Sequence, residues 1–244
     1  MEMSEAISLA HFFFGEDYMD KLNFFDVNKD YINYLQQAEI SKRGFSRVPN
    51  MDYGDKNQKF LCGIVIKSPD TNLDYFVGVT HYPVQKSENF LIVIENDRVP
   101  VKGSLRFNFM FPVPEQMLTV KKINNEADSY YRDLLLKEYK YINSKSNEIK
   151  SQAENVYHKI INRACSQNLL INSCDFLFLE EKCLQYCREN NLPIPITKTH
   201  NTQNQIGMIQ PITEKERSPF NDLLVELQRT ESSPKRPKSH ESER

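Results

Sequence analysis

The fold is decided by residues 59–122, where five segments rich in β-branched and aromatic residues follow one another: KFLCGIVIK (59–67), DYFVGVT (74–80), NFLIVIE (89–95), SLRFNFMFPVP (104–114) and QMLTVKK (116–122). Turn residues such as Ser68-Pro69-Asp70 separate these segments, so each is expected to form a short strand. Short strands joined by tight loops pair antiparallel, and strong twist or closure of the sheet hides its edges. We therefore predict a compact, strongly twisted antiparallel sheet or a small, partly open barrel.

Helical patterns flank this run of strands on both sides. Before it, Phe24–Val27 has the composition of a short strand, and Asn28 can cap a following helix. After it, apolar residues recur at helical spacing, which predicts one long helix or two helices hinged near Asn143-Ser144. A last helix is expected to begin at Asp175. The sequence thus predicts an α+β fold in which helices pack around the sheet.

The length of 244 residues fits one domain with extensions at both ends. Residues 1–22 form an acidic N-terminal extension, and residues 23–197 are expected to form a single domain. Residues 198–244 are polar and interrupted by Pro and Ser, so we expect a disordered tail. Within that tail, residues 219–229 place apolar side chains at helical spacing, which leaves open a short helix that binds a protein partner.

Composition limits the compartment and the cofactors. No segment approaches the roughly 18 consecutive apolar residues of a membrane span, and the N-terminus lacks the basic flank of a signal peptide, so a soluble cytoplasmic protein without a membrane partner is expected. The five cysteines are an odd number and contain no Cys-x-x-Cys pair. Small, reduced, buried thiols are therefore favoured over disulfides or zinc, and no metal or cofactor is predicted.

One segment, residues 78–87, concentrates reactive side chains at the end of a predicted strand. It contains a hydroxyl, an imidazole, a phenol and a cation, at Thr80, His81, Tyr82 and Lys86. Lys59 opens the first long strand, and Tyr53 lies a few residues before it. If these two strands pair antiparallel, Lys59, Thr80 and His81 come within side-chain reach of one another.

Such a cluster has the groups needed for metal-free cleavage of an RNA phosphodiester. In that reaction the 2'-hydroxyl attacks its own phosphate, one group takes the hydroxyl proton, and another protonates the leaving 5'-oxygen. A lysine ammonium stabilises the developing negative charge. The alternative is that these polar residues only form a turn at the strand end.

The chain resembles the type III toxin–antitoxin endoribonucleases, the ToxN and AbiQ group. The matching segments occur in the family's order over about residues 23–190, and the Phe107–Pro114 segment is the most recognisable of them. The others are Phe24–Leu35, Val48-Pro49, Lys59–Val65, Phe76–Thr80, Tyr131–Leu135 and Cys174–Phe176. The resemblance implies a twisted antiparallel sheet with helices around it, and a cytoplasmic, metal-independent endoribonuclease toxin that acts in abortive infection against phages. It also implies cleavage that leaves a 2',3'-cyclic phosphate.

The resemblance extends to the partners. Members of this family cut a repetitive precursor RNA into pseudoknotted antitoxin units and are inhibited by those RNAs. It therefore implies an RNA antitoxin, target RNAs and an RNA-mediated closed hetero-oligomer for this chain.

The resemblance implies catalytic roles for five residues. Lys59 matches the family's strand lysine, and Thr80 matches the threonine of its Thr-Ser-Pro-Lys motif. The sequence departs from the motif at the next positions, because His81 stands in place of the serine, Tyr82 is inserted, and Lys86 follows the proline later than expected. Tyr53 matches the loop tyrosine if two extra residues precede Lys59. We predict that His81 transfers a proton, since imidazole titrates near neutrality.

Cations outside this cluster are expected to contact RNA. Residues 40–163 carry 19 basic and 14 acidic side chains, an excess that suits a polyanionic partner if the cations share a face. The predicted RNA-binding residues lie in the loop after the first helix, on the sheet and on the long helix: Lys42, Arg43, Arg47, Lys56, Tyr82, Lys102, Arg106, Lys137, Lys140, Lys145 and Lys150. Phe45, Tyr53 and Tyr82 can stack on unpaired bases. A catalytically silent RNA-binding protein of the same fold stays open as the alternative to the nuclease.

Overall fold

The computed structural model of the 244-residue chain describes residues 21–51, 59–95 and 97–195. The expectations for the acidic extension before residue 21, for the tail and its helix at 219–229, and for Tyr53 and Lys56 fall outside these residues. The elements, in chain order, are β1 (Asn23–Val27), α2 (Lys29–Arg43), β2 (Leu61–Lys67), β3 (Asp74–Thr80), β4 (Asn89–Val93), β5 (Val101–Arg106), β6 (Phe111–Pro112), β7 (Leu118–Val120), α3 (Ser129–Ser144), α4 (Ser146–Ile161), α5 (Gln167–Ile171) and α6 (Phe176–Glu189).

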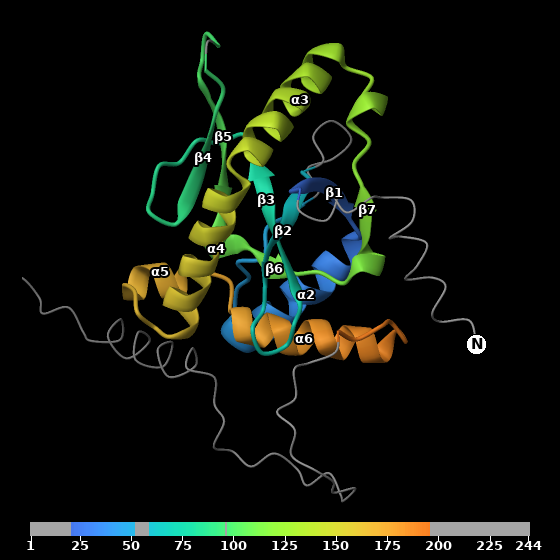
Figure 1. The fold of residues 1–244 in the computed structure, drawn as a ribbon. Coiled ribbons are helices and arrows are strands. Elements are labelled where there is room, and N and C mark those ends of the chain that lie inside the picture. Colours follow the sequence, from blue (N-terminus) through green and yellow to red (C-terminus); the bar gives the residue numbers. More distant parts are fainter. Residues whose placement is uncertain (1–20, 52–58, 96, 196–244) are drawn as a thin grey trace, which may run out of the picture.

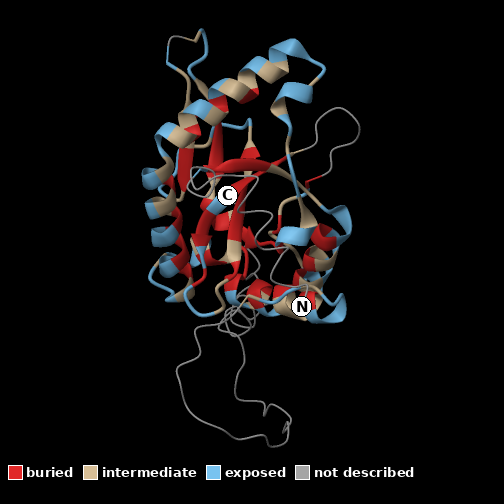
Figure 2. Ribbon diagram, turned by 45° about the vertical axis from the view of Figure 1, so that its right-hand side comes forward, coloured by how far each residue is buried: buried red, intermediate tan, exposed pale blue. Residues whose placement is uncertain are grey.

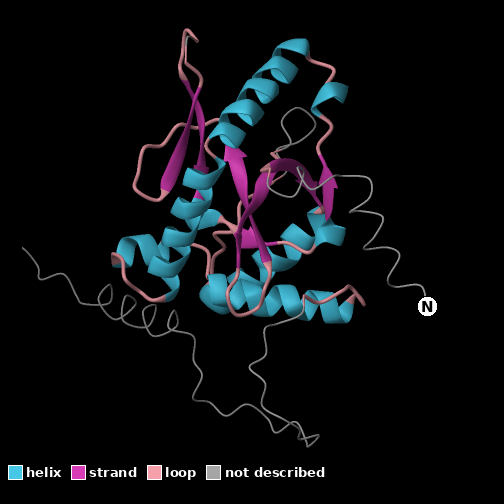
Figure 3. Ribbon diagram, viewed as in Figure 1, coloured by secondary structure: helices cyan, strands magenta, loops and turns pink. Residues whose placement is uncertain are grey.

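The strands form one antiparallel sheet in the order β4-β5-β3-β2-β1-β7, with β6 also pairing with β3. The sheet is open and is not closed into a barrel, so of the two predicted forms the twisted sheet is the one observed. Helices surround it in Figure 3, with α3 and α4 running along one side and α6 across the bottom in that view. The predicted α+β class is confirmed. In the described part of the chain, none of the helices has the length and apolar character that crossing a membrane requires.

The predicted strand at 104–114 is wrong in its extent, because it divides into β5 and β6. Both pieces pair with β3, but the register moves by three residues between Val79↔Leu105 and Phe76↔Phe111. The three extra residues, Phe107–Phe109, form a 3-10 turn. Asn108 lies in this turn, where its amide nitrogen donates to the carbonyl of Asn172 at 2.7 Å.

The helix boundaries follow local signals in the sequence. Asn28 caps α2, since its side chain accepts hydrogen bonds from the N–H groups of Asp30 and Tyr31. Asp175 caps α6 in the same way. The long helical pattern forms two helices: α3 ends at Ser144, and α4 begins at Ser146. Of the two alternatives that the sequence left open, the hinged pair is the one observed.

The core lies between the sheet and the helices. Buried positions fill the strands in Figure 2, while the outward faces of the helices are exposed. Helix α3 is fixed to β1 by aromatic and polar contacts, because the Tyr139 ring packs edge-on against Phe24 and its hydroxyl donates to Asn23 Oδ1 at 3.1 Å. One turn later, Asn143 binds both backbone groups of Leu22. These contacts set the position and rotation of α3 over the sheet.

Candidate active site

The strand pairing places Lys59 opposite Thr80. Leu61 pairs with Gly78 in the β2–β3 ladder, and the Val79 N–H donates to the Phe60 carbonyl at 3.0 Å. Lys59 precedes β2, and continuing the same register by one residue sets it opposite Thr80 at a non-hydrogen-bonded position, where opposite side chains share one face. The predicted antiparallel pairing of these strands is confirmed, and its register, continued past the last paired residues, aligns Lys59 with Thr80.

This register depends on an irregularity in the hairpin. Next to the turn, Lys67 pairs with Asp74, and the register then shifts by two residues between Gly63 and Ile66. If the register near the turn continued unbroken, Lys59 would lie opposite Tyr82 instead of Thr80. A bulge inside a strand commonly re-aims side chains beside a functional site, and here it aligns Lys59 with Thr80.

Strand β5 holds the backbone that follows Thr80. Thr80 pairs with Ser104, whose hydroxyl donates to the Tyr82 carbonyl at 3.0 Å. The Tyr82 N–H in turn donates to Thr80 Oγ1 at 3.3 Å. A Cβ atom on Gly103 would overlap the Thr80 carbonyl oxygen and crowd the His81 Cα. Sequence reasoning missed Gly103 and Ser104, although a glycine inside a strand is a signal of close backbone approach.

His81 is paired with a buried carboxylate from helix α3. Its Nε2 lies 3.3 Å from Oε1 of Glu138, and the Glu138 side chain is fully buried while 43% of the His81 side chain is exposed. The short polar contact with Glu138 raises the pKa of His81, and the carboxylate charge adds to this, whereas partial burial acts in the opposite direction. The pairing stabilises the charged imidazolium.

Sequence reasoning also missed Glu138. Its spacing did indicate a buried position, because Glu138 falls three residues after Leu135 and four before Ile142, on the buried stripe of α3. A carboxylate on an apolar stripe needs a partner, and the sequence alone did not show which group supplies it.

Tyr131 of α3 borders the same site. Its ring lies edge-on to the His81 ring, with 6.1 Å between centroids. Burial raises the pKa of Tyr131 to about 12, and the negative charges of Glu138, Glu126 and Asp26 contribute. Its hydroxyl therefore stays protonated at neutral pH.

Tyr82 and Lys86 lie on the loop that leads from β3 to β4. Tyr82 is 70% exposed, which leaves its ring open to stack on a base. The Lys86 ammonium lies 4.0 Å from Glu88 Oε1, and about half of its side chain is exposed. The structure thus places Lys86 toward the start of β4, five residues beyond His81.

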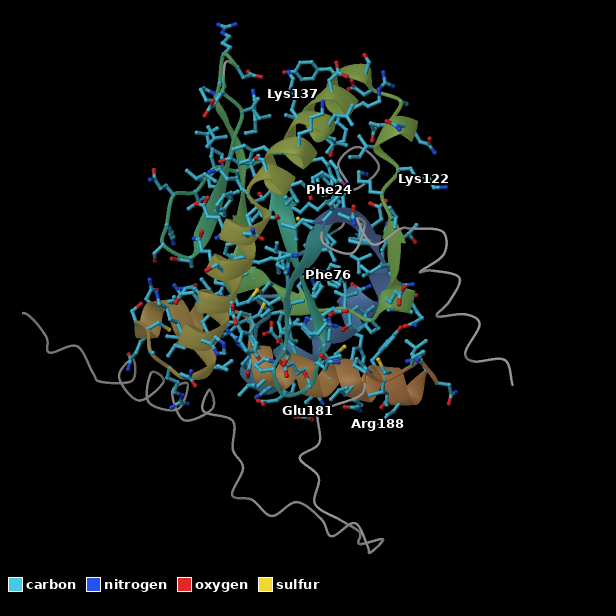
Figure 4. All side chains as sticks on the ribbon, in the orientation of Figure 1. Phe24, Phe76, Lys122, Lys137, Glu181 and Arg188 are labelled. Atoms are coloured by element: carbon cyan, nitrogen blue, oxygen red, sulfur yellow. The ribbon has the colours of Figure 1, made fainter. Side chains whose placement is uncertain are left out.

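The predicted RNA-binding cations fall into two groups. Arg43 is wrong as a surface contact, because its side chain is fully buried and binds Glu39 and the carbonyls of Ser173 and Ile171. Lys42 pairs with Asp175 at 2.8 Å, and Lys102 with Asp97 at 2.6 Å; both are mostly buried. The remaining residues of the set that are at least partly accessible and described are Arg47, Tyr82, Arg106, Lys137, Lys140, Lys145 and Lys150. Lys137 projects from α3 in Figure 4.

The cysteines take no part in the site. All five are free thiols, and Cys62, Cys174, Cys183 and Cys187 are buried, as expected of small packed side chains. Across residues 21–51, 59–95 and 97–195, no group of three or more His, Cys, Asp and Glu side chains gathers as metal ligands would.

Comparison with known proteins agrees with the family resemblance. The family model described as toxin ToxN of type III toxin–antitoxin systems matches residues 23–184. Endoribonuclease ToxN of Bacillus thuringiensis subsp. kurstaki is 30% identical over 179 residues, which cover 68% of this chain and 85% of that protein. Endoribonuclease AbiQ of Lactococcus lactis subsp. lactis is 26% identical, over 75% of this chain and 98% of that protein.

Solved structures show the same fold. One, described as selective toxin inhibition by a non-coding RNA pseudoknot, superimposes with a TM-score of 0.59 at 26% identity and covers 68% of this chain and 98% of its own. The structure of AbiQ, described as a lactococcal anti-phage endoribonuclease of the type III system, gives a TM-score of 0.57 at 26% identity over 69% and 99% of the two chains. The chain belongs to the ToxN family of type III toxin–antitoxin systems, the family of these endoribonucleases.

Proposed function

We propose that this endoribonuclease toxin cleaves RNA without a metal, by attack of a 2'-hydroxyl on the adjacent phosphate, and leaves a 2',3'-cyclic phosphate. The observation that carries the proposal is the register that sets Lys59 opposite Thr80, with His81 next along the chain. The Lys59 ammonium stabilises the charge that develops on the phosphate oxygens. The Thr80 hydroxyl donates to the same oxygens, and His81 transfers a proton.

The RNA is held by the accessible cations and by stacking. Lys137, Lys140 and Lys145 are exposed and bind phosphates, and Tyr82 stacks on an unpaired base close to His81. Lys86 contributes a further phosphate contact. Tyr53 and Lys56 remain predictions as a catalytic and an RNA-binding residue, respectively.

We further propose that the chain's own antitoxin is a repeat-derived, pseudoknotted RNA, which the protein processes and which inhibits it in a closed assembly. Support comes from the relative whose structure is described as toxin inhibition by an RNA pseudoknot. The likeness to AbiQ, described as an anti-phage endoribonuclease, supports a role against phages, and we propose that this role is abortive infection in the cytoplasm.

Cleavage of a purified RNA in EDTA tests the chemistry. The intact protein, Lys59→Ala and His81→Ala are incubated with the RNA, and the product ends are identified. Cutting that persists in EDTA, leaves 2',3'-cyclic phosphates and is lost in both variants supports the proposal. Cutting that requires added Mg²⁺, or that leaves 3'-hydroxyl ends, overturns it.

The catalytically silent RNA-binding alternative rests on the altered 80–86 segment and predicts a different result. The intact protein would then bind RNA with a strong dependence on salt but would not cut it.

A further inference from the structure

Glu138 is a buried carboxylate next to the candidate active site. Its side chain is fully buried, and neither carboxylate oxygen has a hydrogen-bond partner among the residues that the structure describes. A buried carboxylate without hydrogen bonds is unfavourable unless an opposite charge lies nearby. His81 Nε2, at 3.3 Å, is positioned to supply that charge when the imidazole is protonated.

The other titratable and charged groups near this segment come from several parts of the chain. Lys59 lies in the segment just before β2, in register with Thr80, and the ring of Tyr131 in α3 lies edge-on to the His81 ring. Glu126 and Asp26 act on Tyr131. Lys137 neighbours Glu138 in sequence, but its ammonium lies 4.0 Å from Asp97. None of these groups is a cause of the raised pKa of His81; that cause is Glu138.

We propose that Glu138 is a positioning residue that holds His81 as an imidazolium, so that His81 acts as the general acid of the cleavage reaction. The inference rests on the proposed nuclease activity and assigns one of its two proton transfers. Nε2 is engaged by Glu138, which leaves Nδ1–H of a partly exposed ring to serve the substrate.

In this step one bond to phosphorus forms and another breaks. The 2'-oxygen forms a bond to phosphorus while its proton passes to solvent water, and the bond from phosphorus to the 5'-oxygen breaks. The electron pair of that bond goes to the 5'-oxygen, which takes the proton from Nδ1 of His81. His81 regains a proton from solvent after the products leave, so the net reaction moves one proton from the 2'-oxygen to the 5'-oxygen.

The pH profile of cleavage gives the first test. An acid must be protonated, so the rate falls as pH rises through the raised pKa of His81. Glu138→Gln keeps the shape of the side chain and removes its charge, so the falling limb should move to lower pH. Asp133→Asn, an exposed acid on the same helix, is the matched control and should leave the limb in place. An unmoved limb in folded Glu138→Gln overturns the inference.

A substrate with a sulfur in place of the bridging 5'-oxygen gives the second test, and it needs no change in the core. A thiolate leaves without protonation, so a variant that lacks the acid should cut it normally. His81→Gln should lose about 10²-fold or more on ordinary RNA and should recover to near the intact protein's rate on the sulfur substrate. An equal loss on both substrates shows that His81 is not the acid and overturns the inference.

A histidine NMR titration separates this inference from the proposed function. The His81 signal is assigned by its absence in His81→Gln and followed with pH in the full chain and in Glu138→Gln. A titration midpoint above the ordinary histidine range that falls in Glu138→Gln supports the His81–Glu138 pair even if no RNA is cut, in which case the nuclease proposal and the general-acid role fail while the pair stands. An ordinary midpoint that the variant does not change refutes the pair, whether or not RNA is cut.

Discussion

His81 Nε2 lies 3.3 Å from Oε1 of Glu138, and this contact joins the end of strand β3 to the middle of helix α3. The two residues are 57 positions apart in the sequence. Two residues one helical turn apart fix α3 over the sheet. Tyr139 binds Asn23, and Asn143 binds Leu22. The contact therefore links the candidate catalytic segment to the core of the fold.

The pairing predicts a pH-dependent contribution of His81 to stability. Because the pKa of His81 is raised in the folded state, its contribution is fully present below the unfolded pKa of about 6.5 and is lost as pH rises through the folded value. The Tm difference between the intact protein and His81→Gln should be largest near pH 5.5 and shrink toward pH 9.

His158→Gln is the control for this prediction. His158 pairs with Glu154 at 3.9 Å, but both side chains are exposed, so its removal should change Tm little at any pH. A His81→Gln difference that grows above pH 7 would contradict the prediction.

Gly103 should be essential for the geometry of the candidate site. A Cβ atom at this position overlaps the Thr80 carbonyl, which is backbone and cannot move away cheaply. Gly103→Ala is expected to cost about 1–3 kcal/mol of stability and to lower the cleavage rate per folded molecule. Thermal unfolding and cleavage assays measure the two effects.

The matched control is Gly78→Ala in β3. A Cβ atom there meets only the Met51 sulfur, at an ordinary contact distance of 4.0 Å. This variant should keep both stability and cleavage. Equal behaviour of the two variants would show that the approach of β5 to Thr80 is looser than the structure has it.

Arg43 should act on stability and not on RNA affinity. Its guanidinium is fully buried and binds Glu39 and two carbonyls that precede α6, so Arg43→Ala leaves the Glu39 carboxylate without its cation. Breaking such a buried pair costs about 3–5 kcal/mol. Denaturant unfolding should show this loss, while the RNA affinity of the remaining folded protein stays unchanged. A lowered affinity with normal stability would restore Arg43 as an RNA contact.

Lys137 and Lys140 should show the reverse pattern. Both are exposed on α3, so replacing either by Ala should change stability little. If each contacts a phosphate, each substitution lowers the dependence of log affinity on log salt by about one unit. Lys122, which follows β7 and is also exposed, is the control cation. An equal effect of Lys122→Ala would indicate general charge attraction and not a defined contact.

Local signals in the sequence were enough to predict most elements. Asn28 and Asp175 carry side chains that satisfy the first N–H groups of a helix, and these groups lie within three residues of the cap. The division of the long helical pattern near Ser144 was also one of the predicted alternatives. The short helix α5 and the break between β5 and β6 were missed, because the 3-10 turn at Phe107–Phe109 is held by Asn172 and Cys174, which are distant in sequence.

The candidate site, like the fold, was only partly predictable from the sequence. The sequence by itself determined that the strand that follows Lys59 and the strand that ends at Thr80 are neighbours, because a short turn at Ser68-Pro69-Asp70 joins them and favours an antiparallel hairpin. Only the tertiary structure decided that Lys59 faces Thr80, since the register shift between Gly63 and Ile66 is needed for it. It also decided that Glu138 lies against His81 and that Arg43 is buried. These outcomes depend on how α3 and the segment before α6 pack against other elements, and packing between distant segments leaves no local pattern in the chain.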